Sequence, residues 1–275
     1  MIFTSPMTRE RLTITLRKDL LEKIDSLIDG QKIRNRSHAI ESLLSKATHH
    51  HPVKVLILAG GKGVKDPDSG KVIPKAMLPI FGKPLLEHTI TGLHERGLDD
   101  IVISCGTGSE RIKSFFGTGE KFGVSLVYLS QDGLAPGTAQ PLRAAQAAMG
   151  SGSFIVLYGD VLTDLNILDL LEFHKQQRGS IATMTLTSVE HVSMWGLARL
   201  QGSRIASFEE KPENPTTFSH LVNAGVYVME PALFRYIAPD ALKLERDVFP
   251  RLAEEGRLSG YAFDGTWEDV SDLSS

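Results

Sequence analysis

The stretch that decides the fold is VKVLILAGGKG at residues 53–63, followed by PKAMLP at residues 74–79. Residues 55–58 form an apolar run that is short enough for a buried strand. The glycines that follow let the backbone turn sharply and let a ligand approach bare N–H groups, which can form a nest for phosphate oxygens. The sequence therefore predicts a strand that ends in a phosphate-binding loop, with a plain strand-to-loop turn as the alternative. The lysines that add positive charge around this loop are Lys62, Lys65, Lys71 and Lys75.

Composition sets limits on the architecture and on the cellular compartment. The chain has 275 residues, enough for one large domain or for one domain and a small module. Its net charge is −3, although residues 1–51 hold nine Lys and Arg against six Asp and Glu, which indicates a basic N-terminal module. The single cysteine, Cys105, follows an apolar run and is predicted to be a buried thiol. No signal peptide is visible and no apolar stretch approaches about 20 residues, so we expect a cytoplasmic protein without a membrane partner.

The N-terminal residues have the pattern of one strand and two helices. Residues 11–17 alternate strictly between apolar and polar side chains, which indicates a strand. A helix is expected from Lys18 with an apolar stripe up to Ile28, and a second helix over residues 38–47 with Ser37 as its N-cap. Such a small unit cannot bury a sufficient core, and its strand leaves an edge unpaired. We therefore expect a homodimer that pairs strand with strand; whether dimers assemble further is left open.

Residues 9–48 closely resemble a ribbon-helix-helix DNA-binding module. The resemblance implies that the strands of two chains form a ribbon that enters the major groove of DNA. It also implies that Arg11, Thr13 and Thr15 read base edges, while the start of the second helix at Ser37 binds a backbone phosphate. A dimerisation handle without a role in DNA binding is the alternative. The expected domains are residues 1–48 as this β-α-α module, residues 49–52 as a linker and residues 53–275 as a second domain.

Strand-like and helix-like segments alternate from residue 53 onward. This alternation predicts an α/β fold with a Rossmann-like, doubly wound, mostly parallel sheet. Ligands bind such sheets at the carboxyl ends of the strands, where the glycine loop and Asp160 fall. A carboxylate at a strand end can hold Mg²⁺, although a loop aspartate or a helix cap is the alternative for Asp160. The expected strands are residues 55–58, 100–104, 124–129, 154–158 and 181–187, and the expected helices are residues 85–96, 110–116, 138–149 and 167–177.

The glycine loop and the Pro-Lys motif, with the spacing between them, resemble the signature of the sugar-phosphate nucleotidyltransferases, or NDP-sugar pyrophosphorylases. Further motifs in family order cover nearly all of residues 53–271. The resemblance implies attack by a sugar-1-phosphate oxygen on the α-phosphorus of an NTP, with Mg²⁺ bound and pyrophosphate released. Residues 137–139 favour the mannose-1-phosphate guanylyltransferase branch, and therefore GTP. These further motifs are Gly159-Asp160, Trp195-Gly196, Glu210-Lys211-Pro212, NAGVY at residues 223–227 and Trp267-x-Asp269.

The same resemblance implies roles for individual residues. Lys65, Lys75, Asp160 and Asp269 are the implied catalytic residues, and the two aspartates are the implied metal ligands. The implied nucleotide-binding residues are Gly60, Gly61, Gly63, Gln131, Gly137 and Thr138. The implied sugar-phosphate-binding residues are Gly196, Glu210, Lys211 and Asn223. A solvated loop charge is the alternative for Lys211, and a turn residue is the alternative for Asn223.

The sequence departs from the family pattern just after the glycine loop. Val64-Lys65 stands where the family has Thr-Arg, and a lysine offers a point charge in place of the planar fork of arginine. Asp66 and Asp68 follow, and each would repel a triphosphate by about 3 kcal/mol at ~5 Å with an effective dielectric constant near 20. A rival hypothesis is therefore a transcriptional regulator whose second domain binds a nucleotide or sugar nucleotide without turnover.

Overall fold

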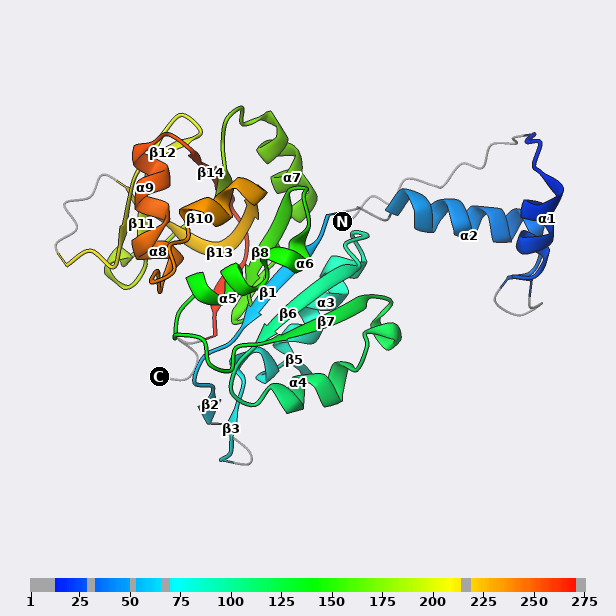
Figure 1. Cartoon of the computed structure of the whole chain (residues 1–275), viewed down its shortest axis with the longest axis horizontal. Helices are drawn as coiled ribbons and strands as arrows, with labels where there is room; N and C mark the ends of the chain where they lie inside the picture. The colour runs from blue at the N-terminus through cyan, green and yellow to red at the C-terminus, as the bar shows by residue number, and fades with distance from the viewer. Residues whose placement is uncertain (1–12, 29–32, 50–52, 66–69, 214–218, 271–275) are drawn as a thin grey trace. The chain divides into compact units, whose positions relative to one another are not determined.

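The computed structural model describes residues 13–28, 33–49, 53–65, 70–213 and 219–270. The chain divides into two compact units, Met1–His49 and His50–Ser275, and each is described by itself (Figure 1). Within the described residues, no helix is both long and apolar enough to cross a bilayer.

The first unit consists of two helices, α1 (Lys18–Asp25) and α2 (Arg36–His49). The Arg36 guanidinium joins them through two bonds to the Asp25 carboxylate, at 2.6 and 2.7 Å. The predicted N-cap at Ser37 is wrong, because the side chain of Asn35 accepts the hydrogen bond from the His38 backbone N–H at 2.9 Å. The described part of the predicted strand, residues 13–17, carries no strand in a single chain, and a ribbon strand requires a partner strand.

The first unit buries little apolar surface. Ile24 and Ala39 are the buried hydrophobic residues among those described in this unit. Four leucines on the two helices or in the turn after α1 are between 39% and 56% exposed: Leu20, Leu27, Leu43 and Leu44. The helices therefore present an apolar surface that the described residues of the same unit do not cover.

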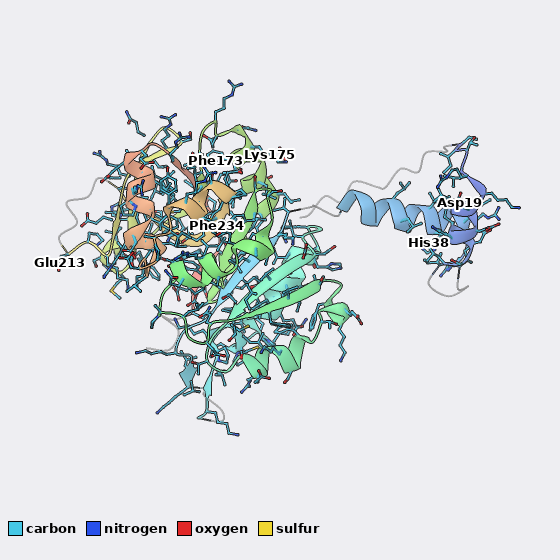
Figure 2. The ribbon with its side chains drawn as sticks, in the orientation of Figure 1. Asp19, His38, Phe173, Lys175, Glu213 and Phe234 are labelled. Carbon is cyan, nitrogen blue, oxygen red and sulfur yellow. The ribbon has the colours of Figure 1, made fainter. Side chains whose placement is uncertain are left out.

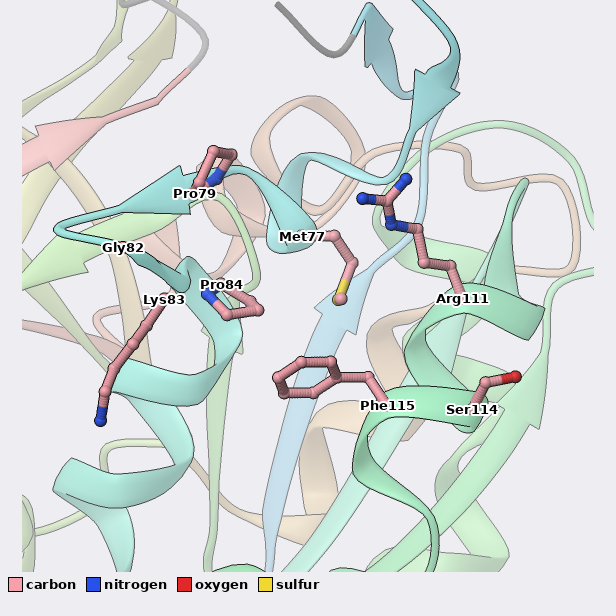
Figure 3. Close-up of a pocket in the computed structure, with 8 residues that line it drawn as sticks. All are labelled: Met77, Pro79, Gly82, Lys83, Pro84, Arg111, Ser114 and Phe115. Atoms are coloured by element: carbon pink, nitrogen blue, oxygen red, sulfur yellow. The ribbon is translucent and has the colours of Figure 1, made fainter. Parts of the chain in front are cut away.

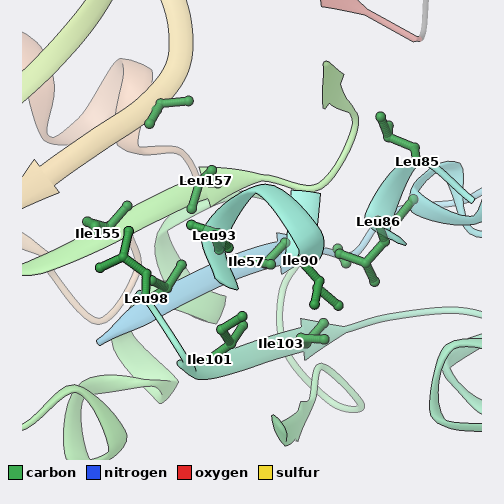
Figure 4. Packing of buried hydrophobic residues seen from close by; sticks show 14 of the residues in the cluster. Ile57, Leu85, Leu86, Ile90, Leu93, Leu98, Ile101, Ile103, Ile155 and Leu157 are labelled. Atoms are coloured by element: carbon green, nitrogen blue, oxygen red, sulfur yellow. The ribbon is translucent and has the colours of Figure 1, made fainter. Parts of the chain in front are cut away.

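The second unit is built on a nine-stranded sheet, and its first half is parallel. The three inner strands of this half are buried along most of their length because other elements cover both faces, while the edge strand at residues 125–130 is partly exposed. Figure 4 shows Ile90 and Leu93 of the covering helix α3 (Leu85–His94) packed near Ile57 of the sheet. In spatial order, the parallel strands are β8 (Phe154–Tyr158), β1 (Val55–Ala59), β6 (Asp100–Cys105) and β7 (Ser125–Ser130).

The second half of the sheet corrects the prediction of a mostly parallel sheet. Strand β13 (Leu221–Met229) runs antiparallel to both β8 and β10 (Ala182–Ser188). A two-residue turn at residues 202–203 joins β11 (Gly196–Gln201) to β12 (Arg204–Glu210), and so short a connection permits only antiparallel pairing. The remaining strand, β14 (Leu258–Ala262), is parallel to β10. The prediction of parallel pairing therefore holds for the strands up to Tyr158 and fails for most of the strands after it.

The four helices predicted for the second unit are present with shifted ends or a break, and the two short helices over residues 244–254 were not predicted. The predicted helix over residues 138–149 is divided at Ala145, and the predicted helix 85–96 ends at His94. The other helices are α4 (Ser109–Phe116), α5 (Ala139–Ala144), α6 (Gln146–Met149), α7 (Ile167–Gln176), α8 (Leu244–Asp247) and α9 (Phe249–Glu254). The 3₁₀ turns are η1 (Lys75–Met77), η2 (Glu120–Phe122), η3 (Val192–Met194) and η4 (Pro231–Tyr236).

Two hydrophobic clusters fill the two faces of the sheet. In one of them the rings of Phe234 and Phe154 stack with centroids 5.5 Å apart. Phe234 is labelled in the view with side chains (Figure 2). The predicted buried thiol is confirmed, because Cys105 is 1% exposed and burial raises its pKa to about 11. These clusters fix the carboxyl ends of β1, β6 and β8, where the candidate site lies.

Candidate active site

The glycine loop leaves the carboxyl end of β1 and lies against Gln131. A Cβ atom on Gly60 would lie 2.0 Å from Gln131 Oε1, so only glycine permits this approach. Gln131 donates through Nε2 to Ser104 Oγ at 3.0 Å, which anchors it at the end of β6. Gly61 and Gly63 have φ angles of 105° and 72°, in the left-handed region that favours glycine. The structure thus brings together four of the residues predicted to bind the nucleotide.

A short hairpin follows the loop. Strand β2 (Val64–Lys65) pairs with β3 (Val72–Ile73), and Lys65 lies opposite Val72. The side chain of Lys65 is exposed. A Cβ atom on Gly63 would lie 2.5 Å from the Ile73 carbonyl oxygen, so the loop and the hairpin are in close contact. Asp66 and Asp68 lie outside the described residues.

Lys75 and Asp160 form an ion pair at the centre of the site. Lys75 Nζ lies 3.0 Å from Asp160 Oδ2, and the two side chains are 30% and 26% exposed. Turn η1 supplies the lysine, while the aspartate follows the end of β8. Gly159 N donates to the Leu58 carbonyl oxygen at 3.0 Å, which holds the end of β8 against the end of β1. The ion pair therefore lies next to the start of the glycine loop.

Asp269 lies beside Asp160, although it is 109 residues after it in the chain. Strand β15 (Trp267–Asp269) pairs with β9 (Val161–Thr163), which places Asp269 opposite Val161. The Val270 N–H donates to the Asp160 carbonyl oxygen at 2.9 Å. Burial raises the pKa of Asp160 and the negative charge of Asp269 raises it further, while Lys75 acts in the opposite direction. The carboxylates of Asp160 and Asp269 and the ammonium group of Lys75 thus lie close together in a partly buried site.

A cavity of about 150 Å³ adjoins Asp269 and contains three of the predicted sugar-phosphate residues in its lining: Glu210, Lys211 and Asn223. Gly196 lies opposite Glu210 in the β11–β12 pair, and a Cβ atom on this glycine would lie 3.1 Å from Glu210 Oε2. Burial raises the pKa of Glu210, the charge of Glu245 raises it further, and the cations Lys243, Lys211 and Arg246 lower it. The cavity lining therefore combines carboxylates with the ammonium group of Lys211.

Asn223 is fixed by a bulge in β13. Its Nδ2 donates to Tyr227 Oη at 2.7 Å, and its Oδ1 accepts from Gly225 N at 3.1 Å. Gly225 has a φ of 75°, and the pairing of β13 with β10 shifts at this point. Trp267 Nε1 donates to the Ala224 carbonyl oxygen at 2.9 Å. Asn223 therefore lies at a bulge within strand β13 and not in a turn, and it lines the cavity.

Lys211 carries local backbone strain. Its φ of 51° lies in the left-handed region, which costs a residue with a Cβ atom about 1–2 kcal/mol. Its N–H donates to the Trp195 carbonyl oxygen at 3.0 Å. The Trp195 ring in turn packs edge-on against the Trp267 ring, with centroids 4.9 Å apart. The strained conformation therefore occurs where Lys211, just after β12, contacts Trp195, just before β11, and both residues line the cavity.

Sequence reasoning missed Glu245, a carboxylate in the cavity wall that is only 7% exposed. It accepts hydrogen bonds from Tyr158 Oη and, at 2.8 Å, from Thr138 Oγ1. Thr138 Oγ1 also accepts from Leu244 N at 2.9 Å. These partners lie 87 and 107 positions from Glu245, so no local pattern marks it.

Gly137 and Thr138, predicted to bind the nucleotide, lie at the Glu245 end of the site. A Cβ atom on Gly137 would lie 2.0 Å from the Leu242 carbonyl oxygen, and its φ is 143°. Ala139 N donates to the same carbonyl oxygen at 3.0 Å. These contacts give both residues a structural role in joining the start of α5 to the segment before α8.

Comparison with known proteins places these features in context. Residues 54–275 match the Nucleotidyl transferase family. The chain is 33% identical to a UTP–glucose-1-phosphate uridylyltransferase from Synechocystis sp., over 79% of this chain and 60% of that protein. It is also 33% identical to mannose-1-phosphate guanylyltransferase catalytic subunit beta from Danio rerio, over 79% of this chain and 61% of that protein. The chain thus spans about three fifths of the length of these curated relatives.

Solved structures show the same fold. A crystal structure from Bacillus anthracis, described as a glucose-1-phosphate thymidylyltransferase in complex with sucrose, has a TM-score of 0.72 and 30% identity, and the match covers 81% of this chain and 92% of that one. A UDP-glucose pyrophosphorylase complexed with UDP-glucose has a TM-score of 0.68 and 23% identity, with 80% and 94% of the chains covered, which supports the fold alone.

Proposed function

Because this chain belongs to the Nucleotidyl transferase family, we propose that it transfers a nucleotidyl group from an NTP to a sugar-1-phosphate, giving an NDP-sugar and pyrophosphate. One observation carries the proposal: Lys75, Asp160 and Asp269 meet between a glycine loop suited to phosphates and a cavity suited to a sugar phosphate. Residues 137–139 and the similarity to guanylyltransferases favour GTP and mannose-1-phosphate.

The reaction needs positioning and charge neutralisation more than covalent catalysis. An oxygen of the sugar phosphate forms a bond to the α-phosphorus while the bond from this phosphorus to the pyrophosphate oxygen breaks. The N–H groups of residues 60–63 and the ammonium of Lys65 hold the departing phosphates. Lys75 supplies positive charge at the α-phosphate. Glu210 accepts hydrogen bonds from sugar hydroxyls, and the amide of Asn223 forms hydrogen bonds with them. Lys211 binds the phosphate of the sugar.

The donor set fits Mg²⁺. Magnesium is held in proteins by one or two carboxylates, with water and phosphate oxygens completing its shell. Asp160 and Asp269 supply two carboxylates, and their mutual repulsion favours a cation between them. When bound, the ion would neutralise charge that develops on the transferring phosphate.

The test is direct turnover. The full chain is supplied with GTP, mannose-1-phosphate and Mg²⁺, and pyrophosphate release is followed; the other NTPs and sugar phosphates are then substituted in turn. We expect release with at least one pair, and its loss in Asp160→Ala. A failure with every pair would favour the rival proposal, in which this domain senses a nucleotide or sugar nucleotide without turnover and tunes DNA binding.

For the first unit we propose dimerisation and DNA binding in the ribbon-helix-helix manner, in a cytoplasmic protein. The supporting observation is the apolar surface of α1 and α2, which a second copy would cover. Thr13 and Thr15 are exposed, as the predicted base readers require, and Ser37 is exposed in the first turn of α2. The third reader, Arg11, lies outside the described residues.

DNA selection from a random library with the full chain tests this proposal. We expect an enriched palindromic sequence whose binding weakens in Arg11→Ala. Absence of sequence preference, with dimerisation retained, would favour a dimer clamp without a DNA role. A DNA footprint that responds to added nucleotide sugar would connect the two units functionally.

A further inference from the structure

Two of the cavities in the second unit differ in character. The larger, of about 470 Å³, lies between helix α4 and the hairpin of β4 (Pro79–Ile80) with β5 (Lys83–Pro84). Figure 3 shows the Met77 side chain ending over the ring of Phe115, and Met77 is only 5% exposed. The apolar floor of this groove is thus covered largely by its own side chains. The smaller cavity beside Asp269 is lined instead by polar groups, several of which are connected behind its wall.

A chain of hydrogen bonds runs from Asn223 to Glu245 through two tyrosines. Asn223 Nδ2 donates to Tyr227 Oη at 2.7 Å. The hydroxyls of Tyr227 and Tyr158 are hydrogen-bonded to each other, and Tyr158 Oη donates to Glu245 Oε1. Each hydroxyl has a single proton to donate, so every bond of the chain runs in the same direction, from the Asn223 amide to the Glu245 carboxylate.

Other contacts hold both ends of this chain. Asn223 Oδ1 accepts from Gly225 N at 3.1 Å, which fixes the direction of the amide. At the other end Glu245 Oε2 accepts from Thr138 Oγ1 at 2.8 Å, and the same hydroxyl oxygen accepts from Leu244 N at 2.9 Å. Glu245 is therefore the terminal acceptor of the chain, and it is held in place without a ligand.

Packing alone does not require these polar groups. Tyr227 is fully buried, and its ring lies 5.2 Å from the Phe249 ring and 5.5 Å from the Tyr158 ring between centroids. A phenylalanine would fill a similar volume without a hydroxyl that must be paired. Glu245 is likewise a carboxylate next to the fully buried Leu244. A satisfied network of buried polar groups makes one arrangement rigid, and here the arranged group that reaches the cavity is the amide of Asn223.

We propose that Glu245 is a positioning residue that holds the Asn223 amide in place for a sugar hydroxyl, acting through the two tyrosines. Among the described residues, Tyr227 and Gly225 are the hydrogen-bond partners of this amide, so one N–H and one acceptor site remain for a ligand in the cavity. A hydroxyl both donates and accepts, whereas a carboxylate at the same place on the sugar only accepts. This role rests on the proposed function, since it assumes that the cavity takes the sugar.

Ligand binding tests the role without turnover. The full chain is titrated by calorimetry with GDP-mannose and UDP-glucose, and with GDP and UDP, which lack the sugar. Tyr227→Phe changes a residue outside the cavity lining. We expect it to weaken the binding of sugar nucleotide by about fivefold and to leave the binding of the diphosphate unchanged. Tyr236→Phe is the matched control, because it removes a tyrosine–carboxylate bond, to Glu255, outside the cavity; it should match wild type.

A double variant separates positioning from a general loss of structure. Asn223→Ala removes the amide, so adding Tyr227→Phe to it should cause no further loss of affinity for the sugar nucleotide. A further loss as large as that of Tyr227→Phe alone would overturn the positioning role. Wild-type affinity in Tyr227→Phe would overturn it as well.

Variants of Glu245 test the far end of the chain. Glu245→Gln keeps an acceptor oxygen for Tyr158, so it should bind the sugar nucleotide more tightly than Glu245→Ala does. Equal losses in the two variants would mean that the charge of Glu245 matters and its place in the chain does not, which would overturn the role.

Failure of this role is distinguishable from failure of the proposed function. If wild type bound neither sugar nucleotide, the proposed function would be contradicted. Thermal unfolding of the ligand-free chain would still show whether Glu245 holds Asn223, because the destabilisation caused by Glu245→Gln and by Asn223→Ala should then be less than additive in the double variant. Fully additive destabilisation would overturn the positioning role whatever the ligand.

Discussion

At the scale of the residue, the surroundings of Asp160 disfavour its ionised carboxylate unless a cation is bound beside it. Burial and the neighbouring Asp269 both raise its pKa above the ordinary value of 3.8, and Lys75 offsets only part of this. A raised pKa means that the ionised form is disfavoured in the folded state relative to the unfolded chain. The cost is absent below the unfolded pKa and is fully present above the folded pKa.

We therefore predict that Asp160→Asn makes the metal-free protein more stable at pH 7 while lowering nucleotidyl transfer by about a hundredfold or more. The Tm difference from wild type, measured in EDTA, should shrink as the pH falls through the raised pKa of Asp160 and disappear below the ordinary value of 3.8, because the carboxyl is then protonated in both the folded and the unfolded wild type. Glu268→Gln, at an exposed acidic position in the same strand, is the control and should show neither effect. A variant less stable than wild type at pH 7 would contradict this account.

Gly60 makes a second prediction at this scale. In Gly60→Ala the new Cβ would overlap the Gln131 side chain and separate it from Ser104, so we expect KM for the NTP to rise by about tenfold or more. Gly152→Ala is the matched control, because its Cβ would meet nothing within 4 Å and its effect on stability should stay within about 0.5 kcal/mol. Equal kinetics in the two variants would show that Gln131 does not position the nucleotide.

At the scale of the element, local pattern was enough for the first half of the sheet. Residues 154–158 form the predicted strand without change, because an apolar run of that length between glycines has few alternatives. The antiparallel half was missed because its strands are placed by pairing between distant segments. Only the motif match predicted that Asp269 would lie near Asp160, and the β9–β15 pair achieves it. Glu245 was missed for the same reason, since its hydrogen-bond partners are distant in the chain.

The β13 bulge yields the prediction for this scale. Trp267→Phe removes the indole donor to Ala224 and keeps an aromatic ring, at a cost of about 1 kcal/mol in stability. Because Asn223 precedes Ala224 in the bulge, KM for the sugar phosphate should rise more than KM for the NTP. Tyr128→Phe, which removes a hydrogen bond to the Gly117 carbonyl oxygen outside the cavity lining, is the control. A rise of the same size in both KM values would mean that the bulge does not serve the sugar cavity.

At the scale of the whole molecule, the transfer site is contained in one unit and the apolar helices lie in the other. We predict that Leu43→Glu, at a residue 42% exposed on α2, lowers the molecular mass in sedimentation by disrupting association. The kcat of transfer should stay within about twofold, since every residue of the site lies beyond residue 53. Val127→Glu, at 46% exposure in the second unit, is the control and should leave the mass unchanged. Loss of association in both variants would place the interface elsewhere.

The buried thiol of Cys105 has a practical consequence. It is the only cysteine of the chain, is almost wholly enclosed, and is a thiolate to a negligible extent near neutral pH. Cysteines introduced at exposed positions would therefore be the only thiols that maleimide dyes reach. With one such cysteine in each unit, a pair of labels could report the separation of the two units by energy transfer, without first removing any native residue.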